Sequence, residues 1–236
     1  MARGGDTYVV DIETVGVPWT SVDDKTREYL LGRAQSDGER EAVQHRLGLS
    51  PGTGRIIVIG MLNISNDHAG GVFVEGKSRG WTADGPVGFR RFDGDEREML
   101  EEFWRMLGSG KVGRIVTFNG RQFDGPYLMI RSALLGVKPT LNLVGYRYSF
   151  DTHCDLAEVL NFRGAVRSNF NLDYWCRRFG VTSPKEEGLD GSRVQEFYDD
   201  GRIDEIAAYC ARDVVATGAL YEKLADTLIP ILDARG

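Results

Sequence analysis

Two acidic residues near the start of the sequence, Asp11 and Glu13, are of a type and spacing that could do chemistry. They follow the apolar residues 8–10, a pattern that predicts a β-strand. Alternate side chains of a strand share a face, so Asp11 and Glu13 project together, while Val10 and Ile12 point the other way, into a core. Two buried carboxylates side by side repel each other unless a cation lies between them. The stretch therefore indicates a metal site; a strand that ends in solvated acids is the alternative.

Two later stretches carry related signals. Asp124 closes the stretch 119–124, at the junction between a predicted strand and a predicted helix, where its alternative use is to cap the helix. Tyr209 and Asp213 lie four residues apart in the last predicted helix, so they share one face at the edge of the core. Taken alone, this pair also fits a packed tyrosine and a solvated aspartate.

Taken together, the three stretches resemble the exonuclease motifs of the DEDD superfamily of 3′-5′ exonucleases. Asp11-Ile12-Glu13 resembles the first motif, Asp-x-Glu; the stretch 119–124 resembles the second, an asparagine followed by an aromatic residue and an aspartate. The third stretch resembles Tyr-x-x-x-Asp, which marks the tyrosine subgroup, because the histidine subgroup would carry its histidine at the position of Ala208. Residues 118–128 and 153–156 make the sequence similar to stand-alone bacterial proteins related to the proofreading domain of family-B DNA polymerases.

This resemblance implies a ribonuclease-H-like fold and two divalent ions, Mg²⁺ or Mn²⁺, as cofactors. The implied metal ligands are the carboxylates of Asp11, Glu13, Asp124 and Asp213. Hard oxygen ligands suit these ions, and a pair of ions can stabilise the attacking and the leaving oxygen of phosphodiester hydrolysis. The implied catalytic residues are these four and Tyr209. A tyrosine, with its ordinary pKa near 10, is expected to orient the attacking water rather than to take its proton.

Four positions beside these residues are expected to contact substrate: Thr14, Asn119, Arg121 and Phe123. Arg121 could reach a phosphate, or could be a solvated turn residue. Phe123 is expected to pack in the core, with stacking on a base as the alternative. His153 follows the last predicted strand and is expected to be structural.

The apolar runs and helix signals predict an α/β protein of one domain, 1–236, with a mixed five-stranded sheet flanked by helices. After the first strand, the predicted strands cover 55–62, 72–74, 114–118 and 146–150. The predicted helices begin near 95, 125, 155, 168 and 204. Asp95 and Glu98 have the spacing of a capping box for the first, Asp155 is expected to cap the third, and Ser168 or Asn169 is the expected cap of the fourth. Residues 15–54 are polar, with helical patches, and predict an excursion between the first two strands.

Composition limits the classes of function. The chain has 236 residues and a net charge of −6, which argues against a basic surface that coats nucleic acid but leaves room for an enzyme that meets phosphate through metal ions and a few arginines. No apolar run reaches the length of a membrane span. The three cysteines lack metal-site spacing and predict free thiols in a reducing, cytoplasmic compartment.

The leading hypothesis is a metal-dependent 3′-5′ exonuclease that releases 5′-mononucleotides from single-stranded DNA. The preference for DNA rests on the finer resemblance alone, so the same chemistry on RNA is the nearest alternative. A non-catalytic nucleic-acid-binding module of the same fold is the second class. The presence of all four carboxylates and the tyrosine weighs against it.

Overall fold

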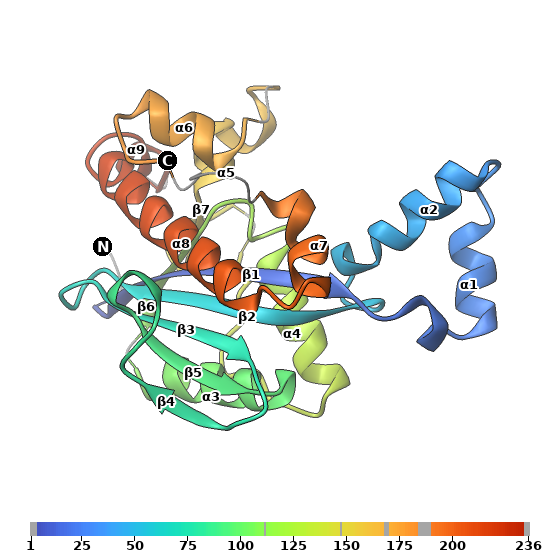
Figure 1. Ribbon diagram of the computed structural model, residues 1–236. Coiled ribbons are helices and arrows are strands. Elements are labelled where there is room, and N and C mark those ends of the chain that lie inside the picture. Colours follow the sequence, from blue (N-terminus) through green and yellow to red (C-terminus); the bar gives the residue numbers. More distant parts are fainter. Residues whose placement is uncertain (1–3, 111, 147, 168–169, 184–189, 234–236) are drawn as a thin grey trace.

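The structure, a computed structural model, describes residues 4–110, 112–146, 148–167, 170–183 and 190–233. A mixed sheet with strand order β4-β5-β3-β2-β1-β6-β7 forms its centre, with helices on both faces (Figure 1). The strands are β1 (Asp6–Gly16), β2 (Gly54–Asn63), β3 (Ala69–Glu75), β4 (Gly80–Thr82), β5 (Arg90–Gly94), β6 (Val112–Thr117) and β7 (His153–Asp155). The predicted α/β class, with a mixed sheet flanked by helices, is confirmed.

The acidic strand β1 lies inside the sheet. It runs antiparallel to β2 and parallel to β6, and β6 runs parallel to β7. The pairing of β1 with β2 shifts register between Glu13 and Thr14, which indicates a bulge directly after the two carboxylates. β1 is thus paired on both sides at Tyr8 and Val9, whereas Asp11 and Glu13 pair with β2, which fixes the direction of their side chains.

The sheet of the described residues has seven strands rather than the five predicted. The short strands β4 and β5 carry glycine and charged residues in place of an apolar run. The strand predicted at 146–150 is wrong, because no described residue of that range is in a strand. The carbonyls of Tyr146 and Ser149 accept hydrogen bonds from the side chain of Arg121 instead of from a neighbouring strand. The last strand, β7, follows this segment.

Within the described residues, two helices cover one face of the sheet and five cover the other. α3 (Glu96–Ser109) and α4 (Asp124–Leu134) pack on the face that buries Val10 and Ile12, as predicted for these two residues. α8 (Ile203–Ala225) runs across the opposite face (Figure 1). Beside it lie α5 (Leu156–Leu160), α6 (Leu172–Arg178), α7 (Val194–Asp199) and α9 (Leu228–Asp233). α8 therefore faces the side of β1 that carries Asp11 and Glu13.

The helix boundaries follow local sequence signals. The predicted capping box of Asp95 and Glu98 starts α3. The side chain of Asp155 caps α5, and that of Asn171 caps α6. The predicted caps of α6, Ser168 and Asn169, lie outside the described residues. Short 3-10 turns cover Trp19–Ser21 (η1), Leu47–Leu49 (η2), Pro86–Gly88 (η3), Phe162–Gly164 (η4) and Gly191–Arg193 (η5).

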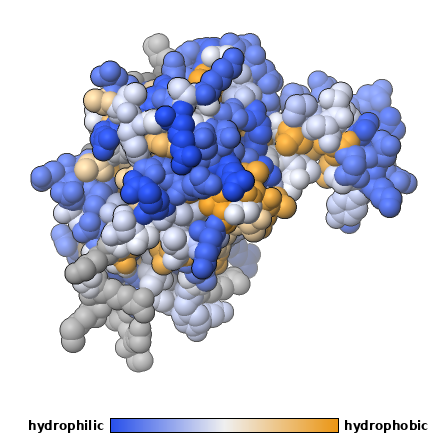
Figure 2. Space-filling view, turned by 90° about the horizontal axis from the view of Figure 1, so that it is seen from below, coloured by the Kyte–Doolittle hydropathy of each residue, from blue (hydrophilic) through white to orange (hydrophobic). Residues whose placement is uncertain are grey.

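Residues 15–54 form an arm that projects from the body between β1 and β2 (Figure 1). The arm carries α1 (Asp24–Leu31) and α2 (Asp37–His45), neither of which has a buried residue. Figure 2 shows apolar surface where the arm joins the body. Leu49 of η2 and Leu134 of α4 are among the exposed large apolar side chains. The helical character expected of this excursion is present.

A search of the described helices for a long, apolar segment able to cross a bilayer gives no candidate.

Candidate active site

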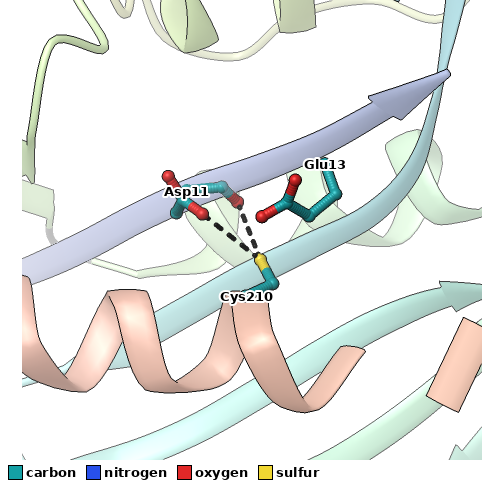
Figure 3. Close-up of side chains that lie close together, drawn as sticks. All are labelled: Asp11, Glu13 and Cys210. Carbon is teal, nitrogen blue, oxygen red and sulfur yellow. Dashed lines mark hydrogen bonds between the residues drawn. The ribbon is translucent and has the colours of Figure 1, made fainter. Parts of the chain in front are cut away.

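Asp11 and Glu13 point from β1 toward α8 and meet Cys210 there (Figure 3). One carboxylate oxygen of each acid and the sulfur of Cys210 all lie within 4.8 Å of one another. The Cys210 Sγ is 3.5 Å from Asp11 Oδ2 and 3.7 Å from the Asp11 carbonyl oxygen. The predicted sharing of one strand face by the two acids is confirmed, and a buried thiol closes the group on the helix side.

A glycine in β2 permits this close approach of α8. A Cβ atom at Gly60 would lie 2.6 Å from Val214 Cγ2 and 2.9 Å from Cys210 Sγ. Gly60 pairs with Asp11 across the two strands. The absence of a side chain there lets α8 press its thiol against the acidic strand.

Asp124 contacts β1 from α4, which packs on the other face of the sheet. The carboxylate is only 4% exposed, and its Oδ1 accepts a hydrogen bond of 3.0 Å from the backbone N–H of Ile12. Burial raises the pKa of Asp124 to about 7, against the opposing effect of its backbone hydrogen bonds. Asp124 is the first residue of α4, and its side chain bonds to β1 rather than capping the helix; Phe123 occupies the N-cap position and makes no side-chain cap bond.

The negative charge of each carboxylate makes it harder for its neighbours to ionise, and their pKa values rise. Burial, followed by the charges of Asp124, Glu13 and Asp213, raises the pKa of Asp11 well above its usual range. Burial and the charges of Asp213 and Asp124 do the same to the pKa of Glu13. A bound cation would reverse both effects, because it neutralises the repulsion and replaces the lost hydration. The group has the chemistry of a cation site built from hard oxygen ligands.

α8 supplies Tyr209 and Asp213 on the face expected from their spacing. Tyr209 is only 7% exposed. Burial and the charges of Asp213, Glu13 and Asp11 raise the pKa of Tyr209 far above its ordinary value. The hydroxyl therefore stays protonated near neutral pH, so it can donate a hydrogen bond but cannot serve as a base.

The loop between β6 and α4 is held by Asp155, at the end of β7. Its buried carboxylate accepts hydrogen bonds from the backbone N–H groups of Asn119, at 2.8 Å, and Arg121, at 3.0 Å. A third bond, 3.0 Å long, comes from Ala157 N and caps α5. Sequence reasoning anticipated only this cap. Asp155 thus also positions the loop that ends in Asp124.

The structure contradicts the predicted phosphate contact of Arg121. This side chain is 6% exposed, and its Nε lies 2.8 Å from Glu158 Oε2. Its terminal nitrogens donate to the backbone carbonyls of Val144, Tyr146, Ser149 and His153. A buried guanidinium with these partners supports the fold and has no surface from which to reach a strand.

The other expected substrate contacts lie near the carboxylates in different environments. The hydroxyl of Thr14 donates to the Gly48 carbonyl at 2.8 Å and ties the returning arm to β1. Phe123 packs partly against the core and the ring of Tyr127, 5.3 Å between centroids. Asn119 has an exposed side chain and a backbone φ of 65°. Contact between these three residues and substrate stays a prediction.

Cys210 is the site residue that sequence reasoning missed. Its signal was its place beside Tyr209 in the same helix turn, but a thiol there also fits the apolar stripe of α8. The structure confirms that the three cysteines are free; all are buried. His153 has the structural role expected of it, with a ring nitrogen 2.8 Å from Thr117 Oγ1.

The fold belongs to the ribonuclease-H-like α/β class. In fold the chain resembles a family B DNA polymerase from the hyperthermophilic archaeon Pyrobaculum calidifontis, with a TM-score of 0.61 and 18% identity. The match covers 99% of this chain and 28% of the polymerase. A family model described as "predicted 3′-5′ exonuclease related to the exonuclease domain of PolB" matches residues 88–228, more than half of the chain. The protein belongs to this family.

Similarity to curated proteins agrees with this assignment. The chain is 26% identical over 148 residues to a DNA polymerase of Desulfurococcus sp. (strain Tok) and 26% identical over 136 residues to one of Pyrococcus glycovorans. It is 25% identical over 143 residues to a catalytic subunit of DNA polymerase epsilon from Schizosaccharomyces pombe. These matches cover 52–55% of the chain but only 18%, 17% and 6% of the respective relatives. The family span contains Asp124, Tyr209 and Asp213, whereas Asp11 and Glu13 precede it.

Proposed function

We propose that the protein is a metal-dependent 3′-5′ exonuclease that removes 5′-mononucleotides from single-stranded DNA. The observation that carries the proposal is the convergence of acids from three separate elements. Asp11 and Glu13 of β1, Asp124 of α4 and Asp213 of α8 influence one another's ionisation. Carboxylates gathered at this cost in repulsion are typical of a divalent metal centre.

The donor set fits Mg²⁺ or Mn²⁺. Asp11, Glu13, Asp124 and Asp213 would hold the ions, because each offers a carboxylate and the pKa shifts of the first three are of the kind that a cation reverses. When bound, two such ions supply electrostatic stabilisation to the attacking and the leaving oxygen of phosphodiester hydrolysis. The sulfur of Cys210 lies within the same group and is a softer donor, better suited to Mn²⁺ than to Mg²⁺.

The chain's own residues would orient the reaction. Tyr209 keeps its proton, so its hydroxyl would donate a hydrogen bond to the attacking water or to a phosphate oxygen. The backbone bond from Ile12 to Asp124 fixes the direction of that carboxylate. Asp155 holds the loop 119–124 in place, and Asn119, an exposed residue of this loop, would contact the terminal nucleotide.

Single-stranded DNA is proposed as the substrate because the chain is similar to DNA polymerases over about half its length. A direct test is to digest matched single-stranded DNA and RNA with the same protein in Mg²⁺ and in Mn²⁺. Strands carry a label at the 5′ end. We expect DNA to shorten stepwise and RNA to be cut more slowly. Faster cutting of RNA would reverse the substrate assignment, and release of the 5′ label as a mononucleotide at the start would contradict the polarity.

A further inference from the structure

A pair of exposed tyrosines lies beside the loop that carries Asp124. Tyr146 is 69% exposed and Tyr148 is 64% exposed, and their rings meet edge to face, with centroids 5.7 Å apart. A single exposed aromatic residue needs no explanation, but two in contact form a patch that marks an interaction surface. Neither the core nor the carboxylate cluster uses these two rings.

Backbone contacts place this pair next to the active site. Arg121 donates to the carbonyls of Tyr146, at 3.3 Å, and Ser149, at 3.2 Å, and Arg121 precedes Asp124 by three residues. The same segment lies against the first turn of α4, because a Cβ atom at Gly125 would be 3.2 Å from the Leu143 carbonyl. The segment with the exposed tyrosines is therefore fixed to the loop and the helix that position Asp124.

An arginine contacts the backbone of this pair. Arg163 of η4 is exposed; its Nη2 donates to the Tyr148 carbonyl at 3.1 Å, and its guanidinium lies 4.3 Å from the centre of the Phe150 ring. A guanidinium has five N–H donors, so this bond leaves capacity for a phosphate. Phe162 and Arg163 both have positive φ, 52° and 55°, a conformation that costs energy in residues other than glycine.

We propose that Tyr146, Tyr148 and Arg163 form a tyrosine ridge that binds the single strand upstream of its 3′-terminal nucleotide. Bases would stack on the tyrosine rings, and Arg163 would contact a phosphate. Aromatic rings together with a cation are the usual means of holding single strands without reading their sequence. The inference rests on the proposed function, since the ridge extends the same active site. In a protein of net charge −6, it supplies attraction that the acidic cluster cannot.

The test measures binding separately from cutting. A 5′-fluorescent oligothymidylate of about 12 nucleotides, long enough to reach past the site, is titrated in excess chelator and followed by anisotropy. Tyr146→Ala combined with Tyr148→Ala should raise Kd by about 10-fold or more, the scale of one or two lost stacking contacts. The paired Phe substitutions should keep Kd within about 2-fold of wild type, because stacking needs the ring and not the hydroxyl. Tyr29→Ala, at an 84% exposed site on α1, is the matched control and should leave Kd unchanged.

Arg163→Ala should flatten the dependence of log Kd on log salt by about 0.7, the value for one phosphate contact on a single strand. Hydrolysis in Mg²⁺ gives an independent readout. The double Ala variant should show a raised KM for the oligothymidylate but unchanged hydrolysis of a dinucleotide, which is too short to reach the ridge. Melting temperatures should match wild type, since the bonds to Arg121 come from backbone carbonyls.

An equal Kd for the double Ala variant and wild type would overturn the ridge. So would an equal loss of hydrolysis on the dinucleotide and on the long strand. A wild-type protein that does not bind the oligothymidylate would also overturn it. Ridge-dependent binding without any cutting in Mg²⁺ or Mn²⁺ would instead support the ridge and overturn the proposed nuclease function. Failure of the ridge proposal is therefore distinguishable from failure of the proposed nuclease function.

Discussion

The hydroxyl of Tyr209 distinguishes a catalytic role of this residue from a packing role. The ring is almost fully buried, and its raised pKa keeps the hydroxyl protonated. Tyr209→Phe keeps the ring and removes only the hydroxyl. We expect kcat to fall by roughly 10²-fold at nearly constant KM, the pattern of an interaction made mainly in the transition state. Steady-state kinetics on single-stranded DNA measures both values, and a Phe variant with wild-type kcat would reduce Tyr209 to a packing residue.

Substitution of Arg121 tests whether this arginine supports the fold or binds phosphate. Arg121→Ala should lower the free energy of unfolding by about 3–5 kcal/mol, because it leaves Glu158 with an unpaired, largely buried charge. Urea unfolding measures this change. Arg97→Ala, which removes an exposed pair with Glu101, is the control and should cost less than about 1 kcal/mol. Unchanged stability together with a raised KM would restore the phosphate contact.

At the scale of elements, the site depends on how closely α8 lies on β2. Gly60→Ala would place a methyl group against Val214 and Cys210. We expect a stability loss of about 1–3 kcal/mol from overpacking. We also expect a fall in kcat, because Tyr209 and Asp213 move with the helix. Adding Val214→Ala removes the nearest clash and should restore part of both losses in thermal melting and in kinetics. An unaltered Gly60→Ala protein would show that the contact is not tight.

The sequence predicted the elements whose signals are local. Alternation placed Asp11 and Glu13 on one face, and capping residues located the start of α3. The strand predicted at 146–150 was wrong because alternating aromatic residues look the same on a strand and on an exposed loop. The short strands β4 and β5 were missed because they have no apolar run and form only by pairing with β3 and each other.

The candidate site also combines residues with local sequence signals and contacts that depend on the fold. Its acids were found through motifs, whereas the burial of Arg121 could not be predicted. The partners of Arg121 are Glu158 and carbonyls from a loop distant in sequence, and only the folded chain brings them together. Asp155 was expected to cap α5, and it does. Its second role, holding the loop before Asp124, depends on the pairing of β7 with β6.

For the whole molecule, the acidic cluster predicts how stability responds to pH without metal. The folded-state pKa values of Asp11, Glu13 and Asp124 are raised, so their favourable contribution is complete at low pH and is lost as pH rises through about 7, the value for Asp124. Burial and Arg121 lower the pKa of His153 to about 3, which has the opposite effect but only below its unfolded value near 6.5. Above that pH the effect of His153 is complete, and the raised pKa values of the carboxylates lower stability as pH rises.

We therefore expect the free energy of unfolding of the metal-free protein to fall between about pH 6.5 and 8.5, by up to about 1.4 kcal/mol per pH unit for each extra proton held in the folded state, and the melting temperature to fall with it. Asp124→Asn should flatten this slope and stabilise the metal-free protein at the alkaline end. Mg²⁺ should raise the melting temperature of wild type more at pH 8.5 than at pH 6.5. A melting temperature that rises with pH in chelator would contradict the assigned pKa shifts.

The clustered carboxylates are proposed to form a metal centre that removes nucleotides from a 3′ end. The most direct measurement is the rate at which a 5′-labelled single strand shortens, with Mg²⁺ or Mn²⁺ added and with excess chelator, for wild type and Asp213→Asn. We expect stepwise shortening by wild type that requires the metal and stops in chelator, and a folded Asp213→Asn protein with little activity. Undiminished degradation in chelator after the metal has been stripped, or full activity of Asp213→Asn, would contradict the account.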